Sequence, residues 1–291
     1  MKNIGKLKFW TLFLILCVAT SDLLAQEITK IKVMSWNIRL DTPNDGDSQW
    51  KFRKDSLCEE IVRQSPDVVG VQEALHNQMK DMRKQLKAYR YVGVGRDDGK
   101  RSGEYSAIFY KKKHVKAIRS GTFWLSETPD IAGSRGWDAA CNRVVTWAEF
   151  REKSSGKHFV MFNTHFDHMG DTARIESAIL IIKKTGSIAG KLPVVLTGDL
   201  NVTDKHRVYR ILTYPENEVV LSDTRVRAGA EIKGPEFTFV GFDPEFVPTQ
   251  LIDYIFATWD FNVISNHILD FRQNIPYFSD HLPVISVLEF K

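Results

Sequence analysis

The sequence predicts an α+β protein in which two packed β-sheets lie between outer helices. Strand-like and helix-like segments alternate from residue 30 to the end of the chain, and no low-complexity linker divides them. Some successive strands are joined by short turns typical of antiparallel hairpins, whereas others are separated by a helix. A mixture of hairpins and strand–helix–strand units is typical of two packed sheets with helices on their outer surfaces.

The first segments form a strand–helix–strand unit. Ile31 and Val33 alternate with lysines in a strand that ends at Asn37. Ser65-Pro66 ends the helix that follows, and its apolar face consists of Leu57, Cys58, Ile61 and Val62. Residues 67–71 form a short apolar strand that leads to Glu73, and helix spacing then resumes at Leu75, Met79, Met82 and Leu86.

The remaining segments are hairpins, one long helix and further apolar strands. Hairpins are expected at 89–94 with 105–110 and at 143–150 with 158–163, a helix at 171–188, and strands at 193–197, 251–257 and 282–290. Two units share one layout: Asn37 and Glu73 end the two strands of the first, and His165 and Asp199 end those of the second. We therefore expect two related halves that direct these side chains toward one cleft.

The composition is that of an ordinary globular protein. The chain has 291 residues, of which 43% are hydrophobic and 26% charged, and this excludes collagen-like, disordered and disulfide-scaffold classes. The net charge is +4, and about half of it comes from residues 1–25. A mature chain so near neutrality lacks the long-range positive charge of a nucleic-acid-binding domain.

The N-terminus has the pattern of a secretory signal peptide. Lysines precede an apolar run at 9–19, and the small residue Ala25 follows a short polar stretch. The run is shorter than the roughly 20 residues that a membrane span needs but suits a signal peptide. We expect residues 1–25 to be removed, leaving one domain at 26–291 with no membrane span, in the periplasm or secreted.

Two alternatives for the N-terminus and one for the cysteines stay open. A retained anchor is disfavoured, as is lipid attachment at Cys17, because the preceding Leu16 is bulky. Cys58 and Cys141 could pair in an oxidising compartment, but Cys58 also fits a buried apolar position on its helix. Neither has metal-site spacing.

Polar side chains gather at the ends of the apolar strands. They are Asn37, Glu73, His165, Asp199, Asn201, Asp253, Asp280 and His281. Carboxylate, amide and imidazole groups without thiolates suit a hard cation such as Mg²⁺ or Mn²⁺. Glu73 is the natural first ligand because it directly follows a buried strand. Any single residue of this set could equally be a turn residue.

Taken in order, six short strings are more specific than any one residue. They read SWN (35–37), QE (72–73), NTH (163–165), GDLN (198–201), IDY (252–254) and SDH (279–281). This set resembles the endonuclease/exonuclease/phosphatase (deoxyribonuclease I-like) superfamily from residue 35 to about 284. Its wording is closest to the deadenylase and nocturnin-like branch. The resemblance implies one catalytic domain with a four-layer α/β/β/α sandwich, two mostly antiparallel sheets flanked by helices.

The resemblance also implies roles for individual residues. Asn37 and Glu73 would bind the metal and the phosphate, and Asp280 would contact a second metal position. Asp199 would align and deprotonate the attacking water, and Asn201 would hold a phosphoryl oxygen. His281 would stabilise the phosphoryl charge or transfer a proton.

Further side chains complete the implied site. Asp253 would fix the His281 ring, His165 would lie across the phosphate with Glu104 as its partner, and Arg143 would clamp the phosphate. Bidentate donation suits Arg for that task better than Lys. Trp137, in a Gly-rich loop near Arg143, could stack on the substrate, and a packing role is an equal alternative.

These implications predict an exported Mg²⁺-dependent phosphoesterase, with a phosphodiesterase or nuclease as the leading hypothesis. The alternative is a phosphomonoesterase on a sugar, inositol or lipid phosphate, and an inactive binding scaffold is disfavoured because Glu73, Asp199 and His281 are all present. The segment VPTQLIDYIF lacks the Trp-Cys-Asp-Arg string of the inositol phosphatases, and Arg39 stands where abasic-site enzymes place an acid. The substrate (small molecule, lipid headgroup or nucleic acid) stays open, and a monomer is the default expectation.

Overall fold

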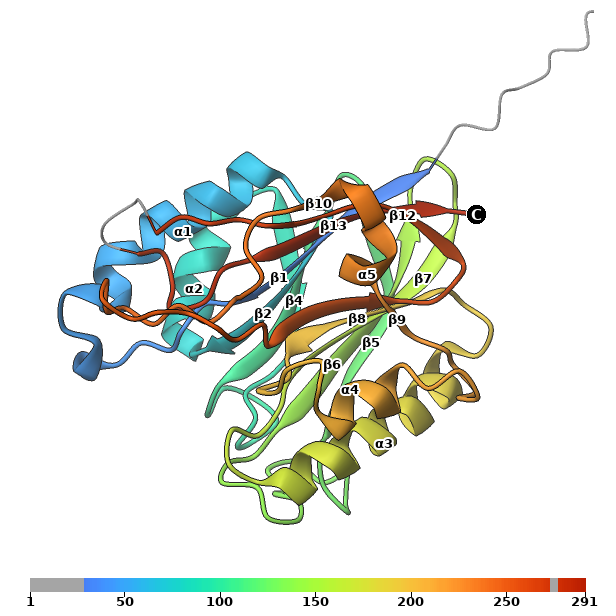
Figure 1. Ribbon diagram of the computed structural model, residues 1–291, viewed down its shortest axis with the longest axis horizontal. Helices are drawn as coiled ribbons and strands as arrows, with labels where there is room; N and C mark the ends of the chain where they lie inside the picture. Colours follow the sequence, from blue (N-terminus) through green and yellow to red (C-terminus); the bar gives the residue numbers. More distant parts are fainter. Residues whose placement is uncertain (1–28, 273–276) are drawn as a thin grey trace, which may run out of the picture.

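Two β-sheets packed face to face form the centre of the molecule, and helices cover their outer surfaces (Figure 1). The computed structural model describes residues 29–272 and 277–291. The expected signal peptide lies outside these residues. Within them, no helix has the length and apolar character required to cross a membrane.

Within the described residues the first sheet has seven strands and the second has six. The first sheet is, in spatial order, β10 (Ile232–Lys233), β12 (Phe261–Ile268), β13 (Val284–Phe290), β1 (Lys30–Asn37), β2 (Val68–Ala74), β4 (Tyr105–Lys111) and β3 (Tyr89–Val92). The second is β5 (Val115–Trp124), β6 (Val144–Glu152), β7 (His158–His165), β8 (Val194–Asp199), β11 (Asp253–Ala257) and β9 (Ser222–Asp223).

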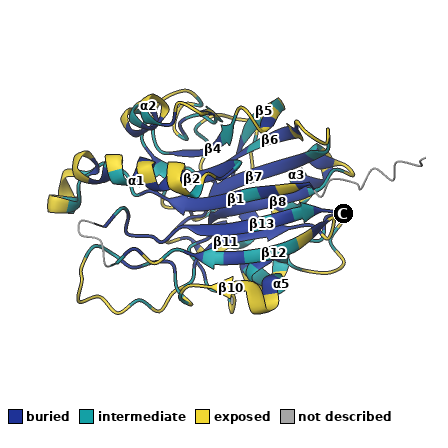
Figure 2. Cartoon of the chain, turned by 90° about the horizontal axis from the view of Figure 1, so that it is seen from above, coloured by how far each residue is buried: buried dark blue, intermediate teal, exposed yellow. Residues whose placement is uncertain are grey.

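The helices form the two outer layers. α1 (Trp50–Gln64) and α2 (His76–Gln85) lie outside the first sheet, and α3 (Asp171–Ala189) and α4 (Arg207–Leu212) lie outside the second (Figure 1). The short α5 (Thr224–Ala228) lies against β11 and β12. Both sheets are buried between these layers, and exposed residues are concentrated on helices and loops (Figure 2). The four-layer α+β sandwich expected from the sequence is confirmed.

The site is positioned by one parallel strand pair in each sheet. β1 and β2 are parallel and connected through α1, and Asn37 pairs with Gln72 in their register. β7 and β8 are parallel and connected through α3, and His165 pairs with Asp199. The carboxyl ends of parallel strands share one edge of a sheet, so the polar residues that end these strands lie side by side.

A polar network between the sheets fixes how these strand ends face one another. The buried Asn163 side chain accepts hydrogen bonds from Gln72 Nε2 (2.7 Å) and Thr197 Oγ1 (2.9 Å) and donates to the backbone oxygens of Val71 and Ala107. Gly70 makes room for this contact, because a Cβ there would lie 2.3 Å from Thr197 Oγ1. Buried hydrogen bonds of this kind, made from one sheet to the other, favour one relative placement of the two sheets.

The sequence expectations for individual elements need three corrections. Strand β5 and strand β12 were not anticipated, because β5 is a largely exposed edge strand and β12 is interrupted by a register shift between Val263 and Ser265. Val62 is 55% exposed and does not belong to the buried face of α1, whereas Leu57, Cys58 and Ile61 do.

Candidate active site

A cavity of about 330 Å³ opens where the parallel strand pairs end. Its lining includes eight of the predicted site residues: Glu73, Glu104, Arg143, His165, Asp199, Asn201, Asp280 and His281. Asn37 and Asp253 lie behind this wall, fully or almost fully buried. Trp137 is the one predicted site residue that belongs neither to the lining nor to the wall behind it. Its backbone N–H donates to the Glu127 carboxylate, and the stacking role of its ring stays a prediction.

The His281 imidazole is held by Asp253 behind it. Asp253 begins β11 directly opposite Asp199 of β8, which brings the two carboxylates to the same ring. His281 Nδ1 lies 2.8 Å from Asp253 Oδ2, and Nε2 lies 3.7 Å from Asp199 Oδ2. Burial alone would lower the pKa of His281, but the charges of Asp253 and Asp199 outweigh it and raise that pKa well above its ordinary value. His281 therefore carries a proton at neutral pH.

The buried Asp199 carboxylate accepts a hydrogen bond on each of its two oxygens. Its Oδ2 accepts from Asn37 Nδ2 (3.0 Å), and its Oδ1 accepts from the Asn201 backbone N–H (2.9 Å). Burial, helped by the charge of Asp253 and opposed by His281, raises the pKa of Asp199 to about 7. A group that exchanges a proton near neutral pH is suited to general acid–base chemistry.

His165 faces the cavity as a neutral imidazole. Burial, reinforced by the nearby Arg143 and Arg96 charges, places its pKa well below the ordinary value. Asn201 Nδ2 lies 3.0 Å from His165 Nε2 and also donates to the Phe166 carbonyl. The proton of the ring is then on Nδ1, which is buried, lies 3.9 Å from Glu104 Oε2 and has no hydrogen-bond partner.

Asn201 and Asn37 make contacts other than those that the family resemblance implies. The Asn201 amide nitrogen is directed to His165 and Phe166 rather than to the cavity, so Asn201 orients the His165 ring. The Asn37 amide oxygen accepts from the Arg39 backbone N–H (3.0 Å), and its nitrogen donates to Glu73 and Asp199. Asn37 therefore holds the two carboxylates in place, and metal binding by its oxygen, which keeps a second lone pair, stays a prediction.

Glu73 and Asp280 form the acidic end of the cavity. Glu73 lies 4.0 Å and Asp280 3.9 Å from the same Arg39 guanidinium. Burial raises the pKa of Asp280, and the charge of Glu73 raises it further, although His281 opposes the shift. Two carboxylates at one end of a cavity are a donor set that a hard divalent cation stabilises. The residues present therefore fit a metal ion at this end.

A second grouping contains the Asp199, Asp253 and His281 side chains, each with one ligand atom within 4.8 Å of the others. All three are buried, and the hydrogen bond between His281 and Asp253 occupies the ring nitrogen that faces away from the cavity. Because the hydrogen bond between His281 and Asp253 engages one ligand atom of each residue, we describe this set as a carboxylate–imidazole pair beside Asp199.

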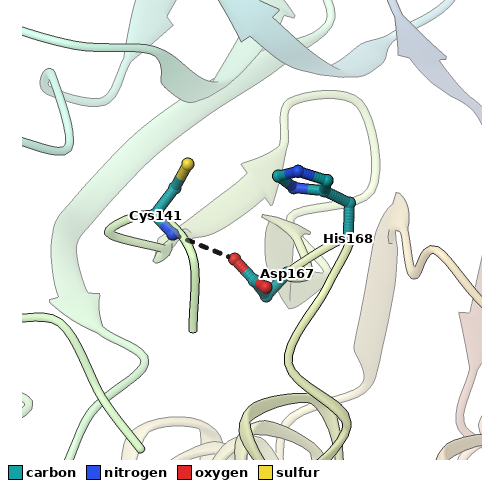
Figure 3. Close-up of side chains that lie close together, drawn as sticks. All are labelled: Cys141, Asp167 and His168. Carbon is teal, nitrogen blue, oxygen red and sulfur yellow. Dashed lines mark hydrogen bonds between the residues drawn. The ribbon is translucent and has the colours of Figure 1, made fainter. Parts of the chain in front are cut away.

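Arg143 is anchored by Asp167 at the opposite end of the cavity. Arg143 Nε donates to Asp167 Oδ2 (3.3 Å), and Nη2 lies 3.0 Å from His168 Nδ1. Cys141 also donates to Asp167 from its backbone N–H, and the His168 ring lies beside them (Figure 3). Arg143 Nη1 is buried without a hydrogen-bond partner, which leaves a charged donor available to a ligand.

Asp167 is saturated by these contacts. Its other oxygen accepts from the backbone N–H groups of Met169 and Gly170, and these bonds overcome burial to lower the pKa of Asp167 well below its usual range. Although Cys141, Asp167 and His168 are close enough to share an ion, Asp167 instead positions Arg143. Cys141 and the buried Cys58 are free thiols.

Sequence reasoning missed several lining residues, among them Arg39, Arg96 and Phe239. Arg96 donates to Glu104 Oε2 at 2.7 Å, and the Phe239 ring packs edge-on against His281 with centroids 5.1 Å apart. Arg96 lies in a Gly-rich turn and Phe239 in an irregular segment, where no strand end marks them. Arg39 was noticed in the sequence only as a departure from the abasic-site enzymes.

Comparisons with known proteins identify the family of the chain. A model described as the Endonuclease/Exonuclease/phosphatase family matches residues 34–281. An endonuclease/exonuclease/phosphatase structure from Bacteroides vulgatus is 43% identical, covers 90% of this chain and 100% of its own, and has a TM-score of 0.85. A mannosyl-6-phosphatase structure from Bacteroides thetaiotaomicron is 36% identical, with coverages of 89% and 100% and a TM-score of 0.82.

Nocturnin of Drosophila melanogaster is 27% identical over 202 residues, which span 62% of this chain and 30% of that protein. The motif resemblance and the family model thus select the same group of proteins over most of the described chain. The chain belongs to the endonuclease/exonuclease/phosphatase family, whose members are metal-dependent phosphoester hydrolases.

Proposed function

We propose that this protein is an exported, Mg²⁺-dependent phosphomonoesterase that acts on a phosphorylated sugar. The observation that carries the proposal is the small cavity of about 330 Å³, in which three histidines and three arginines surround the acidic strand ends. This volume is at the lower end of the roughly 300–1,000 Å³ range of small-molecule sites. It suits a phosphate with one sugar unit better than a polymer.

The monoester alternative has two further supports over the diesterase that the motifs first suggested. A mannosyl-6-phosphatase resembles the chain at 36% identity over 89% of its length. The net charge of +4, from 40 basic and 36 acidic residues, provides only a small excess of cations to neutralise a nucleic-acid backbone, and nucleic-acid affinity largely depends on that neutralisation.

In the proposed reaction Asp199 orients a water molecule and accepts its proton. The pKa of about 7 at this carboxyl lets it do so near neutral pH. His281, protonated and fixed by Asp253, donates a hydrogen bond from Nε2 to a phosphoryl oxygen. As the water oxygen bonds to phosphorus, the bond from phosphorus to the sugar oxygen breaks, and the sugar leaves as the alcohol after taking a proton from solvent water. His165 Nδ1 and Arg143 Nη1, both buried and unpartnered, donate to phosphoryl oxygens as negative charge develops on them.

Glu73 and Asp280 are the proposed metal ligands, and Mg²⁺ is the proposed ion because it takes one or two carboxylates and completes its shell with water and phosphate oxygens. When bound, it supplies positive charge to the phosphoryl group. Asn37 keeps both Glu73 and Asp199 in register through hydrogen bonds of 3.0 Å. Cation and base are thereby held in one geometry.

A phosphate-release assay tests the substrate class. The purified mature chain is given mannose 6-phosphate, glucose 6-phosphate, a phosphodiester, single-stranded nucleic acid and sphingomyelin, each with Mg²⁺ and with EDTA. We expect the sugar phosphates to be hydrolysed with the highest kcat/KM, and only with Mg²⁺. The variant H281A, assayed in parallel, shows that the turnover comes from this site. Faster cleavage of the diester or nucleic acid would contradict the proposal.

Export is tested separately by the processed N-terminus. The cationic start and the apolar run at 9–19 support cleavage before Gln26. Expression of the full chain in a bacterial host, followed by fractionation and N-terminal sequencing, should give a periplasmic or secreted chain that begins at Gln26. A full-length chain in the cytosolic fraction would contradict export without bearing on the catalytic proposal.

A further inference from the structure

The backbone of Arg39, in the cavity wall, is held in an uncommon conformation by several hydrogen bonds. It follows β1 closely and has a φ of 56°, a region that residues with side chains seldom adopt outside functional sites. Its backbone N–H donates to Asn37 Oδ1 (3.0 Å), and its carbonyl accepts from Arg53 Nη2 and Gln78 Nε2, both at 2.8 Å. The backbone at this position is thus fixed on both sides.

The Arg39 guanidinium is fixed as firmly as the backbone. Nε and Nη2 donate to the two oxygens of Asp45 at 3.0 and 2.8 Å, the bidentate geometry that best orients an arginine. Nη1 lies 4.0 Å from Glu73 Oε2, and Nε lies 3.9 Å from Asp280 Oδ2. These two separations exceed hydrogen-bond distance, so Arg39 approaches the carboxylates without being bonded to them.

Among the lining residues, the arginines are divided between the two ends of the cavity. Arg96 bonds to Glu104, and Arg143 is held by Asp167. Arg39 alone accompanies Glu73 and Asp280 at the acidic end. Its side chain is 29% exposed, which leaves Nη1 accessible from the cavity. A ligand that reaches Glu73 therefore meets a positive charge beside it.

We propose that Arg39 binds a non-reacting oxygen of the substrate phosphate and selects dianionic phosphomonoesters over monoanionic phosphodiesters, with Asp45 as its positioning residue. This inference rests on the phosphomonoesterase function proposed above and adds the residue that sets the preference. A monoester presents one more charged oxygen than a diester does. In a diester that oxygen carries a substituent, which cannot accept a charge-assisted hydrogen bond and would crowd Nη1.

The charges of the side chains around Glu73 also support a role of Arg39 in binding the phosphate. Glu73, Asp280 and Asp45 carry three negative charges and Arg39 carries one positive charge, so one divalent cation brings this end to neutrality, with the Arg39 guanidinium as its second cationic group. The positive charge of the Arg39 guanidinium would repel a second divalent cation at this end of the cavity. We therefore expect one metal ion per chain, and we expect the arginine to provide the remaining positive charge.

The test compares R39Q, R39K and D45N with R119Q as a matched control. Arg119 also donates to a carboxylate, Glu149, at 2.6 Å, but it does not line the cavity. Each variant is assayed with Mg²⁺ on p-nitrophenyl phosphate and on bis(p-nitrophenyl) phosphate, which share a leaving group. Mn²⁺ binding is measured independently of turnover by electron paramagnetic resonance, and thermal unfolding reports on folding.

R39Q should lower kcat/KM for the monoester by about 10- to 100-fold, the effect of losing a charge-assisted hydrogen bond. The diester should lose less than about threefold, so the monoester preference falls. R39K should retain part of the monoester preference, because lysine keeps the positive charge but lacks the paired N–H donors of the guanidinium. D45N should raise KM for the monoester more than it lowers kcat. Mn²⁺ should bind at one ion per chain, with unchanged or higher affinity in R39Q.

Equal losses on both substrates in R39Q and R39K would show a structural role and overturn the inference. So would an unchanged substrate ratio, or two Mn²⁺ ions per wild-type chain. Failure of the two proposals is distinguishable. A wild-type protein that cleaves only the diester contradicts the proposed function itself, whereas a wild-type phosphomonoesterase whose R39Q variant keeps the ratio contradicts only the role of Arg39.

Discussion

The buried Asp253 carboxylate lies 2.8 Å from His281 Nδ1 and turns the opposite ring nitrogen toward Asp199. The contact joins residues from two different sheets, because Asp253 begins β11 and His281 precedes β13. It sets both the orientation of the ring and its charge, since the nearby carboxylates keep the proton on the imidazole. A positioned proton donor of this kind depends on its carboxylate as much as on the imidazole.

Replacing Asp253 by Asn should lower kcat by about 10²-fold or more, within the range that a positioned acid–base group contributes. The shape is kept, but the amide cannot stabilise the imidazolium. Steady-state kinetics on the best substrate of the panel measure the effect. The double variant D253N/H281A should be little worse than H281A alone, because the two residues act as a unit. Fully additive losses would show that Asp253 acts elsewhere.

Replacing Glu73 by Gln should raise the Mg²⁺ concentration needed for half-maximal activity, because the amide loses the charge that holds a hard cation. We expect kcat/KM at low Mg²⁺ to fall by roughly 10²-fold or more and to recover partly at high Mg²⁺, since loss of even the outer-shell partners of metal ligands costs about 10–100-fold in affinity or activity. The exposed Glu59 on α1 gives the control E59Q. An unchanged Mg²⁺ titration in E73Q would remove Glu73 from the metal site.

Replacing Arg143 by Lys should raise KM and lower kcat/KM for phosphate esters, although the charge is conserved. The guanidinium holds Asp167 through Nε while Nη1 stays free in the cavity, and a lysine cannot make both contacts at once. We expect a loss of about tenfold or more, the worth of one charge-assisted hydrogen bond. R151K, at an exposed position on β6, is the control. Wild-type kinetics in R143K would place the phosphate away from this end.

The ends of buried strands could be read from the sequence because short apolar runs mark them. Glu73, His165 and Asp199 each follow such a run, and the parallel pairing of the strands then places them at one edge. The contributions of Arg39, Arg96 and Phe239 could not be read in this way. They lie outside the strands, and their positions depend on side-chain contacts such as the Arg39–Asp45 pair, which no periodicity encodes.

Burial also explains why some strands could not be predicted, and side-chain geometry explains why some residues have other roles than expected. Edge strand β5 buries few side chains, so its alternation is weak, whereas a central strand such as β8 is buried throughout. A family motif identifies Asn201 as a site residue, but only the geometry shows that its amide nitrogen faces His165. Sequence thus predicted which residues meet more reliably than which atoms they present.

The β6–β7 turn offers a test of stability against pH that is independent of catalysis. Glu152 ends β6, and its carboxylate accepts four hydrogen bonds of 2.7–2.9 Å from the backbone and hydroxyl groups of Ser154 and Ser155. Burial opposes ionisation, but these bonds outweigh it and lower the pKa of Glu152 from 4.5 to about 2. The charged form is therefore stabilised by folding.

A group whose pKa is lower in the folded chain stabilises it above the unfolded pKa, and that stabilisation is lost as the pH falls toward the folded value. E152Q should lower the free energy of unfolding by about 1–2 kcal/mol at pH 7, and the difference from wild type should shrink steadily below about pH 4.5. Urea unfolding between pH 3 and 7.5 measures it. E289Q, whose side chain accepts one bond from Asn262, is the control. A difference that stays constant down to pH 3 would contradict the stabilising role of the Glu152 charge, because a neutral carboxyl would then be holding the turn equally well.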